Sequence, residues 1–392
     1  MRQLKNIDKY RSNINIIVCG LFQSRQIKLQ KLTADQKKRL KKRLVQSILS
    51  WYKHNKRDLP WRKTHDPYKI WISEIMLQQT RVEQVIPYYY RFLDKFPSIN
   101  VLASSNLDDV LKMWEGMGYY RRARYLLEAA KIIAERHKSK IPSKYEILAT
   151  LPGFGPYTCG SVLSIAYNLP YPAIDGNVIR LMSRLFKIES DITRIATKRT
   201  IEKTVVNLIP ANKASAFSQA LMDMGASVCK SVRPKCNICC CQKFCRAYNE
   251  MPNPEILPKK TKKIRNAHVH IAAGIVRNRN TVLISKRPEN VILGGLWEFP
   301  GGKKERNESL DAACVRELKS KVGISAKIIK PFISIKHHYS HYSVTIHFFC
   351  CSYLSGRLNK STAKWVKIDE LEMHAFSKVH KQVAMKIRDG GC

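Results

Sequence analysis

The chain has 392 residues, with 70 lysines and arginines against 30 aspartates and glutamates and a formal net charge of +40. This length excludes a single small domain, so we expect two domains that each bury a core of their own. General lysine bias accounts for part of the charge, and the remainder favours a polyanionic partner, either nucleic acid or an anionic membrane surface.

The amino-terminal segment, residues 1–30, is predicted to be a basic, disordered extension. Its apolar stretch from Ile14 to Phe22 is interrupted by Asn15 and is too short for a membrane-spanning helix. No small-residue cleavage site follows it, which argues against a signal peptide. Asp8 is the one acidic residue before position 32, so an organelle transit peptide remains open.

Residues 31–250 have the apolar spacing of an all-α domain. Apolar residues recur at helical intervals from Leu40 to Trp51, from Ile70 to Leu93 and from Leu107 to Trp114. Thr33 and Gln36 have the spacing of a capping box, which predicts where the first helix begins.

Residues 251–266 are predicted to be an exposed basic connector. The segment contains Pro252, Pro254 and Pro258, followed by five cations between Lys259 and Arg265. Because prolines stiffen such a segment and like charges extend it, we expect it to lie near phosphates.

Residues 267–392 change to strand patterns and predict an α+β domain. Strands are expected at His268–Arg277 and Thr281–Lys286, around a hairpin at residues 278–280, and again at Tyr342–Tyr353. Helices are expected near Ser309–Val322 and Val379–Ile387.

Six of the twelve cysteines lie between residues 229 and 245, which indicates a metal site and not a disulfide framework. The candidate ligands are Cys229, Cys236, Cys239 and Cys245, separated by six, two and five residues. Four thiolates suit either tetrahedral zinc or a [4Fe–4S] cluster, and the extra Cys240 and Cys241 leave the choice of ligands open. Because four cysteines leave no open coordination position, we expect the metal centre to brace a basic loop near DNA and to break no bond.

A glycine-rich turn, Leu151–Gly160, separates two helical segments. Gly153 and Gly155 permit a tight turn, and the N-terminus of the next helix offers free N–H groups to an anion. Phosphate is the natural ligand, whereas a plain helix–helix turn would need only one glycine.

Two carboxylates are candidates for chemistry. Asp175 precedes a helical segment, where its ordinary role is an N-cap that backbone N–H groups hold ionised. Glu74 lies in an apolar helical segment, and no lysine occupies positions 70, 71, 77 or 78 to pair with it. If Glu74 points inward, burial raises its pKa and makes it a usable general acid, with Asp175 stabilising a sugar cation as in glycosidases.

The cysteine spacing after a helical domain resembles that of the endonuclease-type helix-hairpin-helix DNA glycosylases, and Leu151–Gly160 resembles their hairpin. Leu59–Arg62, Leu77–Thr80 and Gly116–Arg124 narrow the resemblance to the adenine-specific MutY family. This resemblance implies a [4Fe–4S] cluster at the four cysteines, Glu74 as the acid and Asp175 as the sugar-stabilising carboxylate. It further implies that Asn177 and Tyr157 lie beside these carboxylates in the active site, and that the pocket for adenine is lined by Trp61, Arg62, Leu77 and Gln219. The residues that it implies as DNA contacts are Gln79, Thr80, Tyr119, Tyr120, Gly153 and Gly155.

The residue after Pro156 indicates the reaction type. Relatives that also cut the strand have a Schiff-base lysine at that place, and this chain has Tyr157. We therefore expect removal of the base by water, with weak strand cleavage or none.

The carboxy-terminal domain resembles a Nudix domain that has lost its metal ligands. Gly301, Gly302, Glu308 and Arg316–Leu318 resemble the opening of a Nudix box. Ser320 and Lys321 occupy the places of the usual glutamate pair, and a lysine among oxygen ligands repels a divalent cation. Pyrophosphate hydrolysis is therefore not expected.

A MutY-like domain followed by a Nudix-like domain is the architecture of full-length MutY proteins. The resemblance implies that Tyr339, Ser340 and His341 recognise 8-oxoguanine opposite the target adenine. The predicted protein is a monomeric, monofunctional glycosylase that removes adenine opposite 8-oxoguanine or guanine in duplex DNA, with a [4Fe–4S] cofactor. We expect it in a bacterial cytoplasm at the nucleoid, or in a eukaryotic nucleus or mitochondrion, and expect no membrane association.

Three alternatives stay open at this stage. One is a bifunctional glycosylase/lyase of the same fold. Another is a Nudix hydrolase that acts on nucleotide pools. The third is a non-catalytic DNA-binding protein in which Glu74 or Asp175 is only structural.

Overall fold

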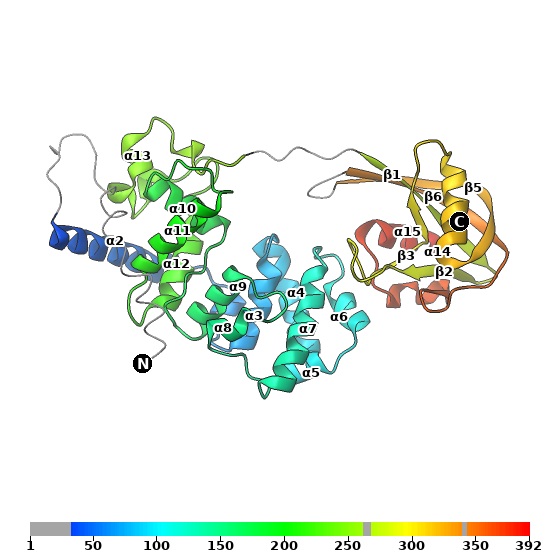
Figure 1. Cartoon of the computed structure of the whole chain (residues 1–392), viewed down its shortest axis with the longest axis horizontal. Helices are drawn as coiled ribbons and strands as arrows, with labels where there is room; N and C mark the ends of the chain where they lie inside the picture. Colours follow the sequence, from blue (N-terminus) through cyan, green and yellow to red (C-terminus); the bar gives the residue numbers. More distant parts are fainter. Residues whose placement is uncertain (1–32, 262–267, 339–342) are drawn as a thin grey trace. The chain divides into compact units, whose positions relative to one another are not determined.

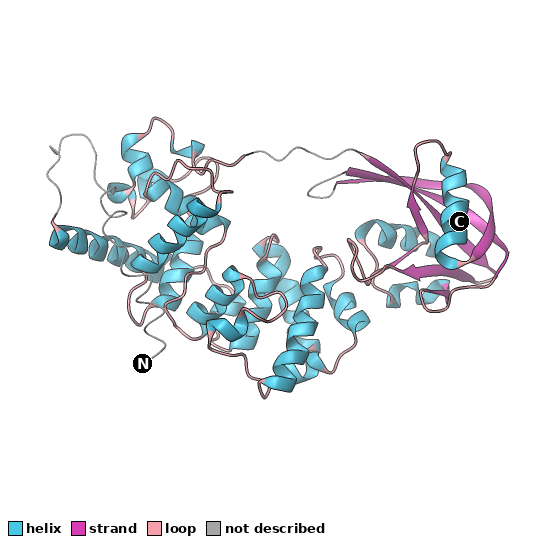
Figure 2. Ribbon diagram, viewed as in Figure 1, coloured by secondary structure: helices cyan, strands magenta, loops and turns pink. Residues whose placement is uncertain are grey.

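The computed structural model describes residues 33–261, 268–338 and 343–392, which form two compact units (Figure 1). Of the described residues, the first unit contains 33–79 and 136–261, and the second contains 80–135, 268–338 and 343–392. Within the described residues, strands occur only from Val269 onward, and everything before them is helix or loop (Figure 2). The helical region expected over residues 31–250 is thus shared between the two units, because helical periodicity does not specify which helices share a core.

The first unit is helical and begins with α2 (Ala34–Asn55). The Thr33 side chain accepts a hydrogen bond from the Gln36 backbone N–H, and the Gln36 side chain accepts one from Thr33, so the predicted capping box is present. The other helices of this unit are η2 (Pro60–Arg62), α3 (Pro67–Leu77), α8 (Tyr145–Leu148), α9 (Pro156–Ser161), η3 (Val162–Ala166), α10 (Gly176–Leu185), α11 (Ile195–Leu208), α12 (Ala214–Ser227), η4 (Cys236–Ile238), η5 (Gln242–Phe244), α13 (Arg246–Glu250) and η6 (Pro254–Ile256).

One core joins α2, α3, α10 and α12. Ile48, Ile70, Met182 and Phe217 are all buried in it. The segments that carry Glu74 and Asp175 are therefore fixed to the same rigid body, which is a condition for the two carboxylates to act together.

The second unit contains a short helical part formed by α4 (Val82–Lys95), α5 (Ile99–Ala103), α6 (Leu107–Trp114) and α7 (Arg121–Arg136). Its core includes Phe92, whose ring lies 4.8 Å from that of Phe96 and 6.0 Å from that of Trp114 between ring centres. The helical spacing from Ile70 to Leu93 belongs to two helices and not to one, because the backbone of Gln79 turns into the left-handed region with φ of 57°.

The remainder of the second unit is an α+β domain. Its strands are β1 (Val269–Asn278), β2 (Thr281–Lys286), β3 (Trp297–Glu298), β4 (Gly301–Lys303), β5 (Ile324–His338), β6 (Ser343–Gly356) and β7 (Ala363–Lys367). Its helices are α14 (Leu310–Val322), η7 (Ile368–Met373) and α15 (Lys378–Arg388).

These strands form one mixed sheet in the order β3-β2-β1-β6-β5, with β4 paired to β1 and β7 paired to β2. Strands β1 and β6 are parallel, whereas β1 and β2 form the predicted antiparallel hairpin. One face packs on α15 through residues such as Phe348 and Val383, and the other packs on α14 through residues such as Ala272 and Leu318. Gly323 ends α14 with φ of 76°, a conformation that costs glycine little.

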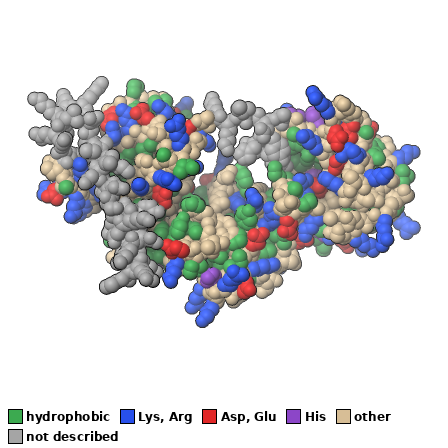
Figure 3. All heavy atoms as spheres, in the orientation of Figure 1, with side chains coloured by type: hydrophobic (Ala, Val, Ile, Leu, Met, Phe, Trp, Pro, Cys, Tyr) green, Lys and Arg blue, Asp and Glu red, His purple; other side chains and the backbone are tan. Residues whose placement is uncertain are grey.

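The surface of the described residues carries the positive charge that the composition predicts. Lysine and arginine side chains are distributed over the visible faces of both units (Figure 3). No helix among the described residues has the length and apolar character needed to cross a membrane.

Candidate active site and cysteine loop

Glu74 points into the first unit, as the sequence analysis required of a general acid. It lies on α3, is 3% exposed, and its Oε2 accepts a hydrogen bond of 2.5 Å from the Tyr157 hydroxyl. Burial raises the pKa of Glu74, and the Tyr157 hydrogen bond and the charge of Arg62 oppose that rise. A buried carboxyl of this kind keeps a proton at higher pH than an exposed one does.

Asp175 is the N-cap of α10, which the sequence analysis also expected. Its Oδ1 accepts a 2.7 Å hydrogen bond from the Val178 N–H, and its Oδ2 accepts a 2.8 Å bond from the Asn177 side-chain amide. Burial raises the pKa of Asp175, and these two hydrogen bonds oppose the rise. The capping bonds therefore favour the ionised carboxylate, as expected, while burial acts in the opposite direction.

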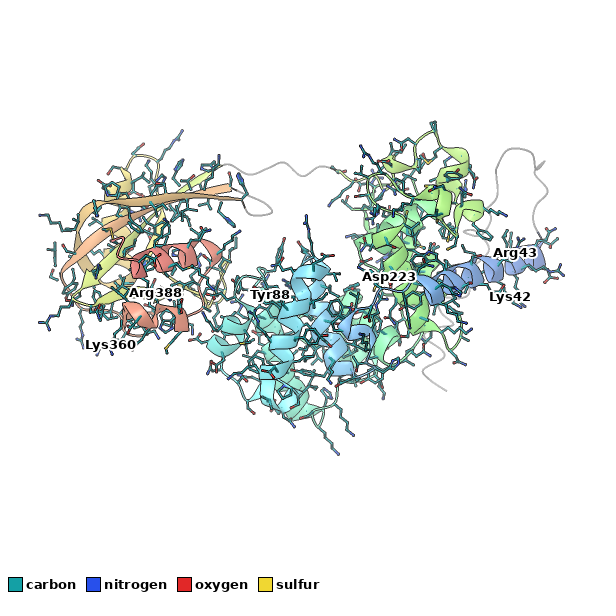
Figure 4. The ribbon with its side chains drawn as sticks, turned by 180° about the vertical axis from the view of Figure 1, so that it is seen from behind. Lys42, Arg43, Tyr88, Asp223, Lys360 and Arg388 are labelled. Carbon is teal, nitrogen blue, oxygen red and sulfur yellow. A yellow bond between two sulfur atoms is a disulfide. The ribbon has the colours of Figure 1, made fainter. Side chains whose placement is uncertain are left out.

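A buried ion pair that the sequence analysis did not predict fixes Arg62. Asp223 lies on α12 (Figure 4) and has no exposed surface. Its carboxylate accepts bonds of 2.7 and 2.9 Å from the two terminal nitrogens of Arg62. Arg57 adds a 2.7 Å bond from Nε to the same carboxylate, and Arg62 also donates to the Tyr52 hydroxyl. Arg62 is thus held by protein groups and lowers the pKa of Glu74 from a fixed position.

The other residues expected around adenine lie in the same unit. Trp61 is 5% exposed within η2, and Leu77 is the half-buried last residue of α3. Gln219 is half-buried on α12, where its side-chain amide donates to the Ser215 carbonyl and hydroxyl. Of these, Trp61 has the least surface with which to contact a base.

The glycine-rich turn has the expected helix after it. Gly153 has φ of 77°, and Phe154 stacks on Trp71 with 5.2 Å between ring centres, which fixes the turn to α3. Gly155 is the N-cap of α9 with φ of −76°, a value that any residue adopts, and a Cβ there would meet open space. Only Gly153 is thus required by backbone conformation, and Gly155 instead leaves the entrance to α9 unobstructed.

The four cysteines of the predicted metal site lie around one small cavity. Cys229, Cys236, Cys239 and Cys245 line a space of about 20 Å³, and Cys241 lines it as well. In the described part of the chain, no three cysteine, histidine or acidic side chains are placed to hold a single metal ion. The structure thus brings the four predicted ligands together at one place, and four thiols are the donor set that either a tetrahedral zinc ion or a [4Fe–4S] cluster requires.

Two arginines of α10 tie the cysteine loop to the helix that Asp175 caps. Arg184 is 2% exposed and donates to the carbonyls of Lys230, Ser231 and Leu257. Arg180 donates to the carbonyls of Cys229 and Gly225 and, at 2.9 Å, to the Asn177 side-chain oxygen. Since Asn177 in turn donates to Asp175, a continuous set of hydrogen bonds connects the loop to the candidate catalytic carboxylate.

The residues expected to contact DNA outside this centre are placed as follows. Gln79 is exposed just after α3, and Thr80 accepts a 3.1 Å hydrogen bond from Arg122. Tyr119 is 42% exposed, whereas Tyr120 is 4% exposed and its hydroxyl accepts from the Gly116 N–H. Of the two tyrosines, Tyr119 is the one with surface to offer a partner. Tyr339, Ser340 and His341 lie outside the described residues.

In the Nudix-like domain, cations occupy the space between the remaining carboxylates. Arg316 donates to Glu308 and, at 2.6 Å, to Glu317, and it lowers the pKa of Glu308 to about 2. The Lys321 ammonium lies 3.6 Å from Glu317 and 3.9 Å from Glu298. This geometry supports the expectation that the domain does not bind a divalent cation, because its own ammonium neutralises the oxygens that would be ligands.

Two family models match the chain. The HhH-GPD superfamily base excision DNA repair protein model matches residues 72–206, and the NUDIX domain model matches residues 272–386. Both agree with the helical part and the α+β part that the structure contains.

Curated relatives and one solved structure agree with these models. The adenine DNA glycosylase of Buchnera aphidicola subsp. Acyrthosiphon pisum is 36% identical over 306 residues, which are 77% of this chain and 84% of the relative. The adenine DNA glycosylase of Homo sapiens is 30% identical over 86% of this chain and 72% of the relative. The structure of a thermostable thymine-DNA glycosylase is similar over 54% of this chain and 97% of that chain, with 28% identity and a TM-score of 0.50. The chain therefore belongs to the MutY family of adenine DNA glycosylases, enzymes of base excision repair that here carry a carboxy-terminal Nudix-like domain.

Proposed function

We propose that this enzyme hydrolyses the bond between adenine and deoxyribose when the adenine lies opposite 8-oxoguanine or guanine. Glu74 acts as the general acid, and Asp175 stabilises the sugar cation. The observation that carries this proposal is the burial of Glu74 against the Tyr157 hydroxyl. Burial raises the pKa of Glu74 and the nearby charge of Asp175 adds to the rise, so a proton is available for a leaving base.

The reaction balances with these groups and one water molecule. As the bond between C1′ and N9 breaks, the bonding electrons leave with adenine and the Glu74 proton goes to adenine N7. The Tyr157 hydroxyl donates to Oε2 of Glu74 and so fixes the orientation of the carboxyl that supplies this proton. Asp175 faces the positive charge on the sugar, as an ion pair or through a bond to C1′. Water then adds to C1′ and returns a proton to Glu74.

Tyr157 supports hydrolysis without strand cleavage. Formation of an imine with the sugar requires an amine nucleophile, and a phenol cannot supply one. Burial raises the pKa of Tyr157 well above its ordinary value, and the adjacent Glu74 charge adds to this effect. The residue is therefore a hydrogen-bond donor that holds Glu74 in place.

We infer that Cys229, Cys236, Cys239 and Cys245 hold a [4Fe–4S] cluster, which would cross-link the loop that Arg180 and Arg184 fasten to α10. Iron and acid-labile sulfide analysis of the purified protein tests this inference. Equal amounts of iron and sulfide are expected, and zinc without sulfide would contradict it.

We further infer that Tyr339, Ser340 and His341 recognise the lesion opposite adenine. Gln79 and Tyr119 are inferred to contact the stacked bases on either side of the flipped adenine. The turn at Gly153 and Gly155 is proposed to bind a backbone phosphate. Exposure of Gln79 and Tyr119 supports these roles. The enzyme is proposed to act as a monomer in the compartment that contains its DNA, which is the bacterial nucleoid or a eukaryotic nucleus or mitochondrion.

A panel of duplexes tests the proposed specificity. Adenine is placed opposite 8-oxoguanine, guanine or thymine, and products are separated with and without alkali. We expect adenine release opposite 8-oxoguanine and guanine, little release opposite thymine, and strand breaks only after alkali. Equal release opposite thymine would contradict the mispair specificity, and strand breaks without alkali would contradict hydrolysis alone.

A further inference from the structure

The amino-terminal half of α2 carries an exposed group of cations that the catalytic site does not use. Before Leu44, where burial of α2 in the core begins, all residues of the helix except the half-buried Lys37 and Leu40 are exposed. Four cations in this part, here called the α2 quartet, are Lys38, Arg39, Lys42 and Arg43. Figures 1 and 4 show this end of α2 extending beyond the other helices of the first unit, with Lys42 and Arg43 on it.

The α2 quartet forms one face of the helix. At 3.6 residues per turn the four side chains fall within a sector of about 140°, opposite the direction in which Leu44 and Ile48 enter the core. All four are exposed, and none makes an ion pair with another described residue. The one acidic residue of α2 is Asp35, in its first turn.

This arrangement is unfavourable for the isolated helix. Lys38 and Lys42 are four residues apart, as are Arg39 and Arg43, and like charges at this spacing destabilise a helix. The capping box at Thr33 fixes where the helix begins, so the quartet is held on an ordered face despite its repulsion. A polyanion bound along this face would remove the repulsion.

The charge spacing of the quartet matches that of duplex DNA. Lys38 and Arg43, its first and last charges, are five residues apart, about 7.5 Å at 1.5 Å per residue, which gives about one charge per 1.9 Å for the four charges. Duplex DNA carries one charge per roughly 1.7 Å of axis. A membrane surface is a poorer partner, because the apolar side chains Leu44, Val45 and Ile48 are buried in the core and cannot enter a bilayer.

We propose that the α2 quartet is a sequence-independent binding surface for the DNA backbone, separate from the catalytic centre. The inference rests on DNA as the substrate and not on the proposed mispair specificity. In this role the quartet increases the affinity for any duplex and leaves the excision step unchanged.

The test compares the full-length protein with the variant K38Q/R39Q/K42Q/R43Q. Binding of a fluorescent, undamaged 30-base-pair duplex is measured by anisotropy between 50 and 200 mM salt. Each phosphate contact contributes about 0.9 to the slope of log affinity against log salt, so the slope is expected to become shallower by about 2 to 3.6. The variant K38R/R39K/K42R/R43K keeps the charge and should retain the wild-type slope, and circular dichroism checks that helix content is unchanged.

A second control, K198Q/R199Q/K203Q, removes three exposed cations of α11 and is expected to change the slope by less than one contact. An unchanged slope in the quartet variant would overturn the proposal. Binding to phosphatidylglycerol vesicles is measured as well, and a variant that lost binding to the vesicles but not to the duplex would also overturn it. Adenine release by the wild type and by the quartet variant at saturating enzyme is measured in parallel and is expected to be equal. If the slope became shallower in the quartet variant but the wild type released no adenine, the proposed function would be contradicted. The assignment of the quartet as a DNA-binding surface would still stand.

Discussion

Removal of the Asp223 charge is expected to destabilise the first unit strongly. Asp223 has no exposed surface, and the side chain of its main partner, Arg62, is 9% exposed. In Asp223→Asn the guanidinium remains buried without an opposite charge. Loss of one partner of a buried ion pair costs about 3–5 kcal/mol, which for a unit of this size lowers the unfolding midpoint by roughly 6–20 °C.

An exposed ion pair of the same unit provides the matched control. Lys63 and Asp58 lie 2.9 Å apart, but their side chains are 65% and 80% exposed, so Asp58→Asn is expected to cost less than about 1 kcal/mol. The double variant Arg62→Met/Asp223→Leu removes both buried charges and should recover most of the stability that Asp223→Asn loses.

Urea unfolding followed by tryptophan fluorescence measures these differences, because Trp51, Trp61 and Trp71 all belong to this unit. The account predicts a large loss for Asp223→Asn, a small one for Asp58→Asn and recovery in the double variant. If Asp223→Asn and Asp58→Asn were equally stable, the buried ion pair would not have the structural role assigned to it.

Three further changes test other parts of the site. In Tyr157→Phe, Glu74 loses a hydrogen bond that favours its ionised form, so its pKa rises further and the alkaline limit of the single-turnover rate moves to higher pH; a limit that stays or moves to lower pH would refute this. In Arg184→Lys, one ammonium replaces a guanidinium that donates to three carbonyls of the cysteine loop and its neighbour, so the loop is held less firmly. A chelator should therefore remove iron from this variant faster than from Arg199→Lys, which changes an exposed residue of α11, and equal rates of iron loss would contradict the bracing role of Arg184. In Lys321→Glu, a carboxylate replaces the ammonium beside Glu298 and Glu317, so calorimetry should detect Mg²⁺ binding that the wild type lacks, and no binding in either protein would contradict the explanation given.

The features that the sequence predicted well are local ones. The start of α2 follows from Thr33 and Gln36, and the bounds of α6 follow from its apolar spacing, because capping and periodicity involve residues within a few positions of each other. The hairpin between β1 and β2 was confirmed for the same reason: Arg279 occupies a left-handed position in a short turn.

Strand β5 was not predicted. It is one of the longest strands, but its apolar alternation is broken in the middle, where Ile329, Lys330 and Pro331 are all exposed and the register with β6 shifts. Its position in the sheet comes from pairing with β6, which no local pattern reveals. Helical periodicity also describes one helix at a time, so it does not specify which helices pack together.

Within the active site, the family resemblance supplied the residues and the structure supplied their partners. Tyr157 is 83 positions from Glu74, and Asp223 is 161 positions from Arg62, so neither hydrogen bond could be read from spacing. One signal for Asp223 was present: a single aspartate lies among apolar residues on α12, and a buried carboxylate needs a cationic partner. The sequence did not indicate which of 70 cations that partner is.

The most direct test of the central claim is single-turnover excision from a duplex with adenine opposite 8-oxoguanine. The wild type is compared with Glu74→Gln and with Glu202→Gln, which changes an exposed glutamate of α11 in the same unit. The account predicts rapid adenine release by the wild type and by Glu202→Gln, and loss of release in Glu74→Gln, while all three bind the duplex equally. Adenine release by Glu74→Gln at the wild-type rate would show that Glu74 is not the acid.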